Sequence, residues 1–278
     1  MRRKIFALLL ALSLCLTACG TAVPEPERLP EGENTGPEVS YIPLDDRPVN
    51  ADRVVYLAES LGYRLTMPEE DLYRTRLDGQ DTNPNGTAYG DRAGLYAWLQ
   101  EREAAGCDRY VLSLDQLLSG GLVNSRSFPG ADVTLRDGTV LTEEAFLAAI
   151  LDLLADGENE VYLLDTVMRL APTVGYDGWD LAGYEVLRSY GMAARPTLSG
   201  DALTVESIAA AYPLGADGTP LDPADYGVTE EAVARYLRCR ERKLRLIDEA
   251  LRLTEGRENI HFLIGVDDSA PTDSVQTN

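Results

Sequence analysis

Short apolar runs alternate with segments of helical periodicity along most of the chain. In the helical segments apolar residues recur at steps of three and four positions, and a glycine closes several of them. The short runs are mostly apolar, as expected for parallel strands buried on both faces of a sheet. The predicted strands are residues 39–44, 63–68, 109–115, 160–165 and 259–268. The predicted helices are residues 51–62, 92–106, 142–157 and 229–256.

This alternation predicts an α/β fold with a mostly parallel sheet and flanking helices. The strands suit either an open Rossmann-like sheet or an incomplete (β/α) barrel. Residues 171–229 interrupt the alternation, because they are rich in Gly, Pro, Asp and Tyr, and we expect one or two helices there. After residue 271 only a short polar segment remains. We therefore expect the α/β domain, residues 39–278, to be truncated at its carboxy end.

Residues 1–18 are typical of a bacterial lipoprotein signal peptide. Three basic residues precede an apolar segment, residues 5–16, that is too short to span a bilayer. Leu-Thr-Ala-Cys at residues 16–19 matches a lipobox, so we expect a lipid on Cys19 and an anchor on the extracytoplasmic face of the cell membrane. The alternative is an ordinary cleaved signal. Residues 19–38, rich in Pro, Glu and Gly, predict a flexible tether.

The chain is strongly acidic, with 46 Asp and Glu against 25 Lys and Arg and a formal net charge of −21. Such a surface repels nucleic acid, so no nucleic-acid partner is expected. His261 is the single histidine, and its place in a predicted strand favours a packed residue over a metal ligand. Only Cys107 and Cys239 remain for the folded domain, where two buried free thiols are expected.

Four apolar runs end on charged or polar residues. They are YIPLDDRPVN at residues 41–50, VLSLDQLLSGGLVNSR at 111–126, VYLLDTVMRLAPT at 161–173 and FLIGVDDSAP at 262–271. Ligands of α/β folds gather at the carboxyl ends of the strands. The repetition therefore predicts one site at that edge of the sheet.

Aspartates are the candidate acid, base or nucleophile groups of this site. Paired carboxylates suit glycoside hydrolysis, in which one is a protonated acid and the other is ionised, and they suit Ca²⁺ or Mg²⁺ equally well. No cofactor or dedicated metal site is predicted, and a divalent cation stays an open alternative. The candidates are Asp45, Asp46, Asp115, Asp267 and Asp268.

Arginines and small polar residues in the same motifs are candidate substrate-binding groups. Arginine would orient an oxygen-rich, anionic substrate through paired hydrogen bonds. A glycine pair allows a positive φ or the close approach of a ligand. The candidates are Arg47, Asn50, Gly120, Gly121, Asn124, Arg126 and Arg169; the last needs a partner if buried, either Asp165 or a ligand.

The four motifs at the ends of the apolar runs, in the order in which they follow along the chain, resemble the signature blocks of the bacterial domain-of-unknown-function family 4127. The resemblance covers nearly all of the chain after residue 38. It implies an α/β protein without an assigned activity, and family members are usually much longer than this chain.

The leading hypothesis is a lipid-anchored extracytoplasmic enzyme of the carbohydrate-hydrolase type, acting on a small-molecule or glycan ligand. The alternatives are a non-catalytic lipoprotein that binds a sugar or anion with the same groups, and an inactive truncated remnant. A catalytic carboxyl pair should contain one group with a raised pKa. In a binding protein all the carboxylates should be paired with arginine or other donors.

Overall fold

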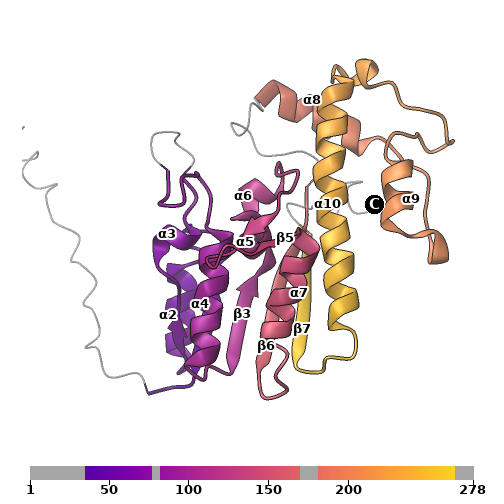
Figure 1. The fold of residues 1–278 in the computed structure, drawn as a ribbon. Coiled ribbons are helices and arrows are strands. Elements are labelled where there is room, and N and C mark those ends of the chain that lie inside the picture. Colours follow the sequence, from indigo (N-terminus) through magenta and orange to yellow (C-terminus); the bar gives the residue numbers. More distant parts are fainter. Residues whose placement is uncertain (1–34, 77–81, 170–180, 267–278) are drawn as a thin grey trace, which may run out of the picture. The chain divides into compact units, whose positions relative to one another are not determined.

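Five parallel strands form the central sheet of the structure, a computed structural model that describes residues 35–76, 82–169 and 181–266 (Figure 1). The described residues from Gly36 onward belong to one compact unit. Across the sheet the order is β2 (Arg64–Thr66), β1 (Glu38–Ile42), β3 (Arg109–Ser113), β6 (Glu160–Val167) and β7 (Ile260–Val266). β2 and β7 are edges, so the sheet is open. The α/β prediction is confirmed, and the barrel alternative is wrong.

The helices between these strands lie on both faces of the sheet. Helix α2 (Asp52–Ser60) joins β1 to β2, while α4 (Arg92–Ala104), α7 (Glu143–Leu153) and α10 (Glu230–Thr254) precede β3, β6 and β7. The connection from β1 to β2 runs across the sheet in one direction, and the connections that lead to β3, β6 and β7 run in the opposite direction. Because such crossovers are right-handed, α2 covers one face and the other three helices cover the opposite face. This is a doubly wound, flavodoxin-like order whose direction reverses between β1 and β3.

The main core lies on the face that α4, α7 and α10 cover. The side chains of Ile42, Leu112 and Leu163 alternate onto this face and are fully buried against helix residues such as Leu99 and Phe146. Thr142 caps α7, since its Oγ1 accepts a hydrogen bond from the N–H of Ala145 at 3.2 Å. Tertiary packing of these apolar stripes, more than helix propensity, stabilises the layer.

The opposite face is thinly covered. Helix α2 has no fully buried residue, and its neighbour Leu61 is 75% exposed. On β7 the side chain of Leu263, which points to this face, is also about half exposed. The expectation of a packed His261 is wrong, because its side chain is exposed and stacks on Tyr162 with ring centroids 4.7 Å apart.

Helix α10 joins two buried clusters. Its carboxy-terminal half contributes Leu246 and Ala250 to the main core. Its amino-terminal half packs Tyr236 and Cys239 into a second cluster with residues 187–228 of the excursion. Cys239 and Cys107 are both buried free thiols, as expected. The long helix therefore connects the sheet with the excursion.

Several short elements were not predicted from periodicity, because each spans only one or two turns or a few residues. They are α3 (Glu70–Tyr73), α5 (Leu114–Ser119), α6 (Leu122–Ser125), the hairpin strands β4 (Val133–Thr134) and β5 (Val140–Leu141), α9 (Val205–Ala211) and the 3₁₀ helices η1 (Gly200–Ala202) and η2 (Pro223–Tyr226). Helix α8 (Leu181–Met192) is the helix expected in the excursion.

Candidate functional site

The loops that follow β1 and β3 meet where the strand order reverses. The N–H of Leu122 donates a hydrogen bond to the carbonyl of Leu44 at 3.4 Å. Ligands of doubly wound folds bind at this switch point, beyond the carboxyl ends of the strands. The fold thus brings the first two polar motifs together at the expected edge.

Asp45 is the buried carboxylate of the first motif. Its Oδ1 accepts hydrogen bonds from Nε of Arg47 at 3.0 Å and Nδ2 of Asn50 at 2.7 Å. Its Oδ2 lies 2.7 Å from a terminal guanidinium nitrogen of Arg47. Burial, followed by the charge of Asp45, raises the pKa of the neighbouring Tyr41 to about 12. Asp45 is therefore a paired carboxylate that orders its own loop.

Asp46 points away from Asp45, as expected for adjacent residues after a strand. Its Oδ1 accepts a hydrogen bond from the N–H of Thr75 at 3.3 Å, and its Oδ2 lies 3.9 Å from Nε of Arg74. About a quarter of the Asp46 side chain is exposed. Neither aspartate caps the following helix, because α2 begins after Ala51 without a side-chain hydrogen bond at its cap.

The glycine pair of the second motif adopts left-handed backbone conformations. Gly120 has a φ of +73° and Gly121 a φ of +130°. A Cβ on Gly120 would lie 2.8 Å from the carbonyl oxygen of Gly90, and one on Gly121 would lie 3.0 Å from Oγ1 of Thr75. Both positions therefore require glycine. Their backbone role is confirmed, and their role in ligand binding stays a prediction.

Buried polar atoms without a hydrogen-bond partner among the described residues gather beside Gly121. They are Oγ1 of Thr75 and Oε1 of Gln116, while the Nε2 of Gln116, also without a partner, lies against Gly90. The Gln116 Oε1 lies 3.4 Å from where a Gly121 Cβ would be, so it faces the same small space as Thr75. Buried polar atoms in folded proteins almost always have a partner. This part of the edge therefore has unused hydrogen-bonding capacity.

A buried lysine joins the ends of β3 and β6. The Nζ of Lys243 lies 2.6 Å from Oδ1 of Asp115 and also pairs with Oδ1 of Asp165. Oγ1 of Thr166 donates to the second oxygen of Asp115 at 2.8 Å, while Oδ2 of Asp165 has no partner among the described residues. Asp115 was expected at a strand end but lies in the first turn of α5, because Oγ of Ser113 caps that helix.

This cluster has an excess of negative charge when both carboxylates are ionised. Burial, together with the charge of Asp115, raises the pKa of Asp165 to about 6, although Lys243 opposes the shift. Burial disfavours the charge of Lys243, but the two carboxylates outweigh it and its pKa is raised. Lys243 therefore stays charged, and Asp165 takes up a proton at a higher pH than an ordinary aspartate.

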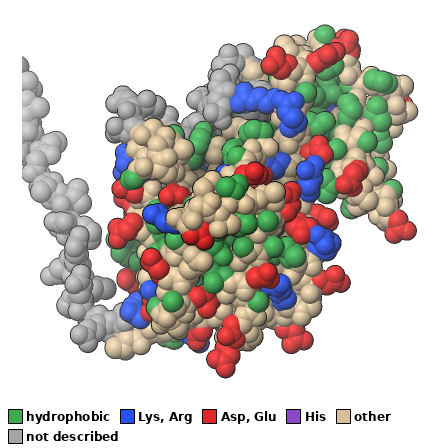
Figure 2. Space-filling model, in the orientation of Figure 1, with side chains coloured by type: hydrophobic (Ala, Val, Ile, Leu, Met, Phe, Trp, Pro, Cys, Tyr) green, Lys and Arg blue, Asp and Glu red, His purple; other side chains and the backbone are tan. Residues whose placement is uncertain are grey.

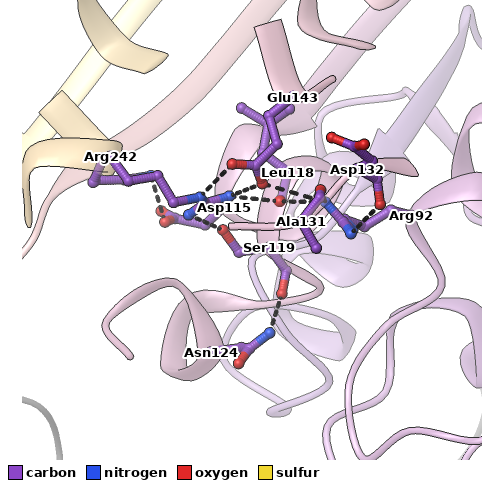
Figure 3. Close-up of polar contacts among 10 residues, drawn as sticks. Arg92, Asp115, Leu118, Ser119, Asn124, Ala131, Asp132, Glu143 and Arg242 are labelled. Carbon is purple, nitrogen blue, oxygen red and sulfur yellow. Dashed lines mark hydrogen bonds and ion pairs between the residues drawn. The ribbon is translucent and has the colours of Figure 1, made fainter. Parts of the chain in front are cut away.

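A second cluster lies between α4, α7 and α10 (Figure 3). Glu143 accepts hydrogen bonds from two guanidinium nitrogens of Arg242, at 2.6 and 2.7 Å, and lies 3.3 Å from Arg92. Both guanidinium groups also lie over the ring of Phe128, 4.7 and 5.0 Å from its centroid. Burial lowers the pKa of Arg92, Glu143 opposes this, and Arg242 adds to it. One carboxylate faces two guanidinium groups, so the cluster keeps a positive charge.

A cleft of about 800 Å³ opens above this cluster. The loop before α4, the segment from α5 to β4, and the amino-terminal half of α10 form its walls. Arg92, Arg235 and Arg238 line it together with Ser119 and Asn124. Figure 2 shows acidic side chains spread over the visible face, with smaller groups of basic side chains among them. Arginine is thus concentrated in the lining of this cleft, although the protein as a whole is acidic.

The remaining candidates are distributed as follows. The Nδ2 of Asn124 donates to the carbonyl of Ser119 at 2.6 Å, beside the glycine pair. Arg126 is buried, and the carbonyl of Arg169 accepts a hydrogen bond from Oη of Tyr236 at 2.7 Å. Asp267, Asp268 and Cys19 lie outside the described residues. The structure thus brings the first two motifs together. Whether the last motif belongs to the same site stays a prediction, because its two aspartates lie outside the described residues.

Five residues of these clusters were not predicted from the sequence, namely Lys243, Glu143, Arg242, Arg92 and Gln116. One signal was available for Lys243: it is one of only two lysines in the chain, the other being Lys4. It also lies in the apolar stripe of its helix, four residues after Cys239 and three before Leu246. A charged residue in such a stripe calls for a buried partner.

Two features are absent from the described residues. They contain no group of three or more His, Cys, Asp and Glu side chains that could hold a metal ion. None of their helices has both the length and the apolar character needed to cross a membrane.

The fold and the site define an open, doubly wound α/β protein with a polar carboxyl edge. The chain belongs to the family described as protein of unknown function (DUF4127), whose model matches residues 39–277. The family resemblance of the four motifs is thereby confirmed.

None of the curated proteins compared with the chain matches it. A solved structure, the crystal structure of an uncharacterized protein, is similar with a TM-score of 0.21 and 12% sequence identity. The match covers 83% of this chain and 54% of that one, so the chain spans about half the length of that protein.

Proposed function

We propose that this protein binds a carbohydrate at the carboxyl edge of its sheet, between the loops that follow β1 and β3. The observation that supports this is the group of buried polar atoms on Thr75 and Gln116 without partners among the described residues. Each such atom costs about 1–3 kcal/mol unless a partner is supplied. A sugar hydroxyl both donates and accepts, so it suits an amide and a hydroxyl that face one space.

The charge pattern of the first motif supports binding as well. Asp45 is paired with Arg47 and Asn50, as expected for a binding protein. The Arg47 side chain is 58% exposed, so a ligand in solution can reach it while Asp45 holds it in place. Such prior ordering reduces the entropy lost on binding.

Replacing Gln116 tests this proposal. In Gln116→Leu the unpartnered amide is removed, so the midpoint of thermal unfolding should stay equal or rise, while glycan binding on an array is lost. Gln100→Leu makes the same change at an exposed position of α4 and should alter neither quantity. Unchanged glycan binding by Gln116→Leu, or the absence of any bound glycan in the unmutated chain, would rule the proposal out.

Hydrolysis of the bound carbohydrate is the second candidate function. It is favoured by one observation, the raised pKa of Asp165 next to Asp115, since glycoside hydrolysis uses one protonated and one ionised carboxyl. Both side chains are almost completely buried, however, at 3% and 0% exposure. The carboxyl pair, like the fully buried Gln116, would need to become accessible to a ligand. Binding is placed first because it also draws on Arg47, which is exposed and held in place by Asp45.

Reducing-end release separates the two candidates. A hydrolase should release reducing sugar from a glycan that it binds, and Asp165→Asn and Asp115→Asn should both abolish the release. Glycan binding without release in the unmutated chain supports the binding function alone.

The lipid anchor on Cys19 is proposed from the sequence of residues 1–19. Diacylglyceryl attachment would hold the protein at the extracytoplasmic face of the membrane, because burial energy accumulates with each methylene of the acyl chains. Cells fed a radiolabelled fatty acid should label the unmutated chain, and Cys19→Ser should lose the label. An unlabelled unmutated chain would contradict the anchor.

A further inference from the structure

The arginine-lined cleft beside α10 shares Asn124 with the motif that follows β3, but Thr75, Gln116 and Arg47, which carry the proposed function, do not line it. Its volume of about 800 Å³ lies within the range of small-molecule sites. Its lining comes from three segments far apart in the sequence: residues 85–93, residues 119–134, and two arginines of α10. A cleft assembled from such distant parts is a feature of the tertiary fold.

Arg235 and Arg238 provide the charge of the cleft wall. They lie three residues apart on α10, so they occupy the same side of the helix. Arg238 is exposed and forms no ion pair or hydrogen bond with the residues that the structure describes. Further along the same helix, Arg245 and Arg252 instead pair with Glu241 and Glu249. Arg238 therefore keeps its hydrogen-bond donors available on a chain with many carboxylates.

The acidic residues of the cleft do not cancel this charge. Asp91 already accepts a hydrogen bond from the N–H of Gly94 at 2.9 Å and lies 3.6 Å from Arg136. Glu143, below the cleft, is shared between Arg92 and Arg242. Asp132 is one further carboxylate among the described lining residues, against Arg238 and the positively charged cluster of Arg92, Glu143 and Arg242. The net charge of the described side chains at the cleft is positive, so the cleft attracts an anion.

The other lining groups suit hydroxyls and a sugar ring. Asn85 and Thr87 hydrogen-bond with each other and with the carbonyl of Tyr89, which orders this loop, and Ser127 and the aromatic ring of Tyr89 also line the cleft. Arg92 is held by Glu143 and by the carbonyls of Ala131 and Asp132, at 3.1 and 3.3 Å (Figure 3). This side of the cleft is thus ordered before a ligand arrives, which favours binding.

We infer that the cleft is a binding site for an anionic carbohydrate, with Arg235 and Arg238 holding its carboxylate or phosphate group. A guanidinium matches either group with two parallel hydrogen bonds. This inference does not depend on the strand-end site, because Gln116, Thr75 and the first motif do not line the cleft.

Calorimetric titration of the full-length chain in detergent solution tests the inference. The probes are trigalacturonate, glucose 6-phosphate, maltotriose and inorganic phosphate. One of the two anionic sugars should bind, and which one binds distinguishes a carboxylated from a phosphorylated ligand. Arg238→Gln and Arg235→Gln should each weaken that binding about tenfold or more, because each loses a charge-assisted pair of hydrogen bonds.

Two controls keep the result specific. Arg245→Gln removes an arginine of the same helix outside the cleft and should leave the affinity unchanged. Gln116→Leu should also leave it unchanged, so failure of the strand-end proposal can be told from failure of this one. The inference is overturned if neither anionic sugar binds, if maltotriose or inorganic phosphate binds as tightly, or if both arginine variants bind like the unmutated chain.

Discussion

The Nζ of Lys243 lies 2.6 Å from Oδ1 of Asp115, although the two residues are 128 positions apart in the chain. The contact joins α10 to the first turn of α5, directly behind the switch point of the sheet. Both side chains are buried, and Asp165 shares the same ammonium group. The candidate site therefore rests on an ionic cluster that links three distant segments.

Removing the lysine should strongly destabilise the protein. Lys243→Met leaves two buried carboxylates without their cation, and the expected loss in the free energy of unfolding is about 3–5 kcal/mol at pH 7. Urea denaturation measures it. Arg245→Met is the matched control on the same helix, where an exposed pair with Glu241 is lost, and should cost no more than about 0.5 kcal/mol. Equal losses in the two variants would contradict a structural role for the cluster.

The raised pKa of Asp165 predicts a pH-dependent stability. Its pKa is about 6 in the folded protein, against about 3.9 in an unfolded chain. A raised folded pKa means that the stabilisation is present below pH 4 and is lost as the pH rises through 6. Relative to Asp165→Asn, the unmutated chain should lose about 3 kcal/mol between pH 4 and pH 7 in urea denaturation. If the difference in unfolding free energy between the two proteins does not change from pH 4 to pH 7, Asp165 stays ionised in the folded protein.

Gly130 should not tolerate a side chain. It has a φ of +100°, and a Cβ there would lie 2.5 Å from Oε2 of Glu143. Gly138 has a similar φ of +87°, but a Cβ there would meet no atom within 4 Å, so Gly138→Ala isolates the backbone strain. Gly130→Ala should lose about 1–3 kcal/mol more than that control in thermal unfolding, because it displaces Glu143 from Arg242. Equal losses would mean that the glutamate moves without cost.

The exposed apolar edge at β7 predicts self-association. Leu263 and Ile264 are 53% and 39% exposed on β7, which has a strand partner on one side only among the described residues, and backbone groups at such an edge template pairing. Residues 36–278 should therefore form oligomers, and Leu263→Lys should reduce their mass in size-exclusion chromatography with light scattering. Val140→Lys, at a residue 59% exposed on the small hairpin, is the control and should not change the mass. A monomeric unmutated chain at all concentrations would refute this prediction.

The local pattern of apolar residues determined the elements of the main sheet. The five strands and four of the helices follow from the residue pattern alone, since each lies within a longer apolar run or helical repeat of the sequence. The repeated charges after the apolar runs also located the first part of the site at Asp45 and in the glycine pair. Short elements such as α5 and the hairpin carry too few residues for a periodicity to appear.

Tertiary structure decided which charges become partners. The sequence placed Asp115 among catalytic candidates and gave no role to Lys243, yet the fold buries both in one ion pair. It likewise brought Arg235 and Arg238 of α10 to the same cleft as Asn85 and Ser127. Periodicity reflects which side of an element faces the core, and this is a local property. The partner of a buried charge depends on strand order and helix packing, which bring together residues more than a hundred positions apart.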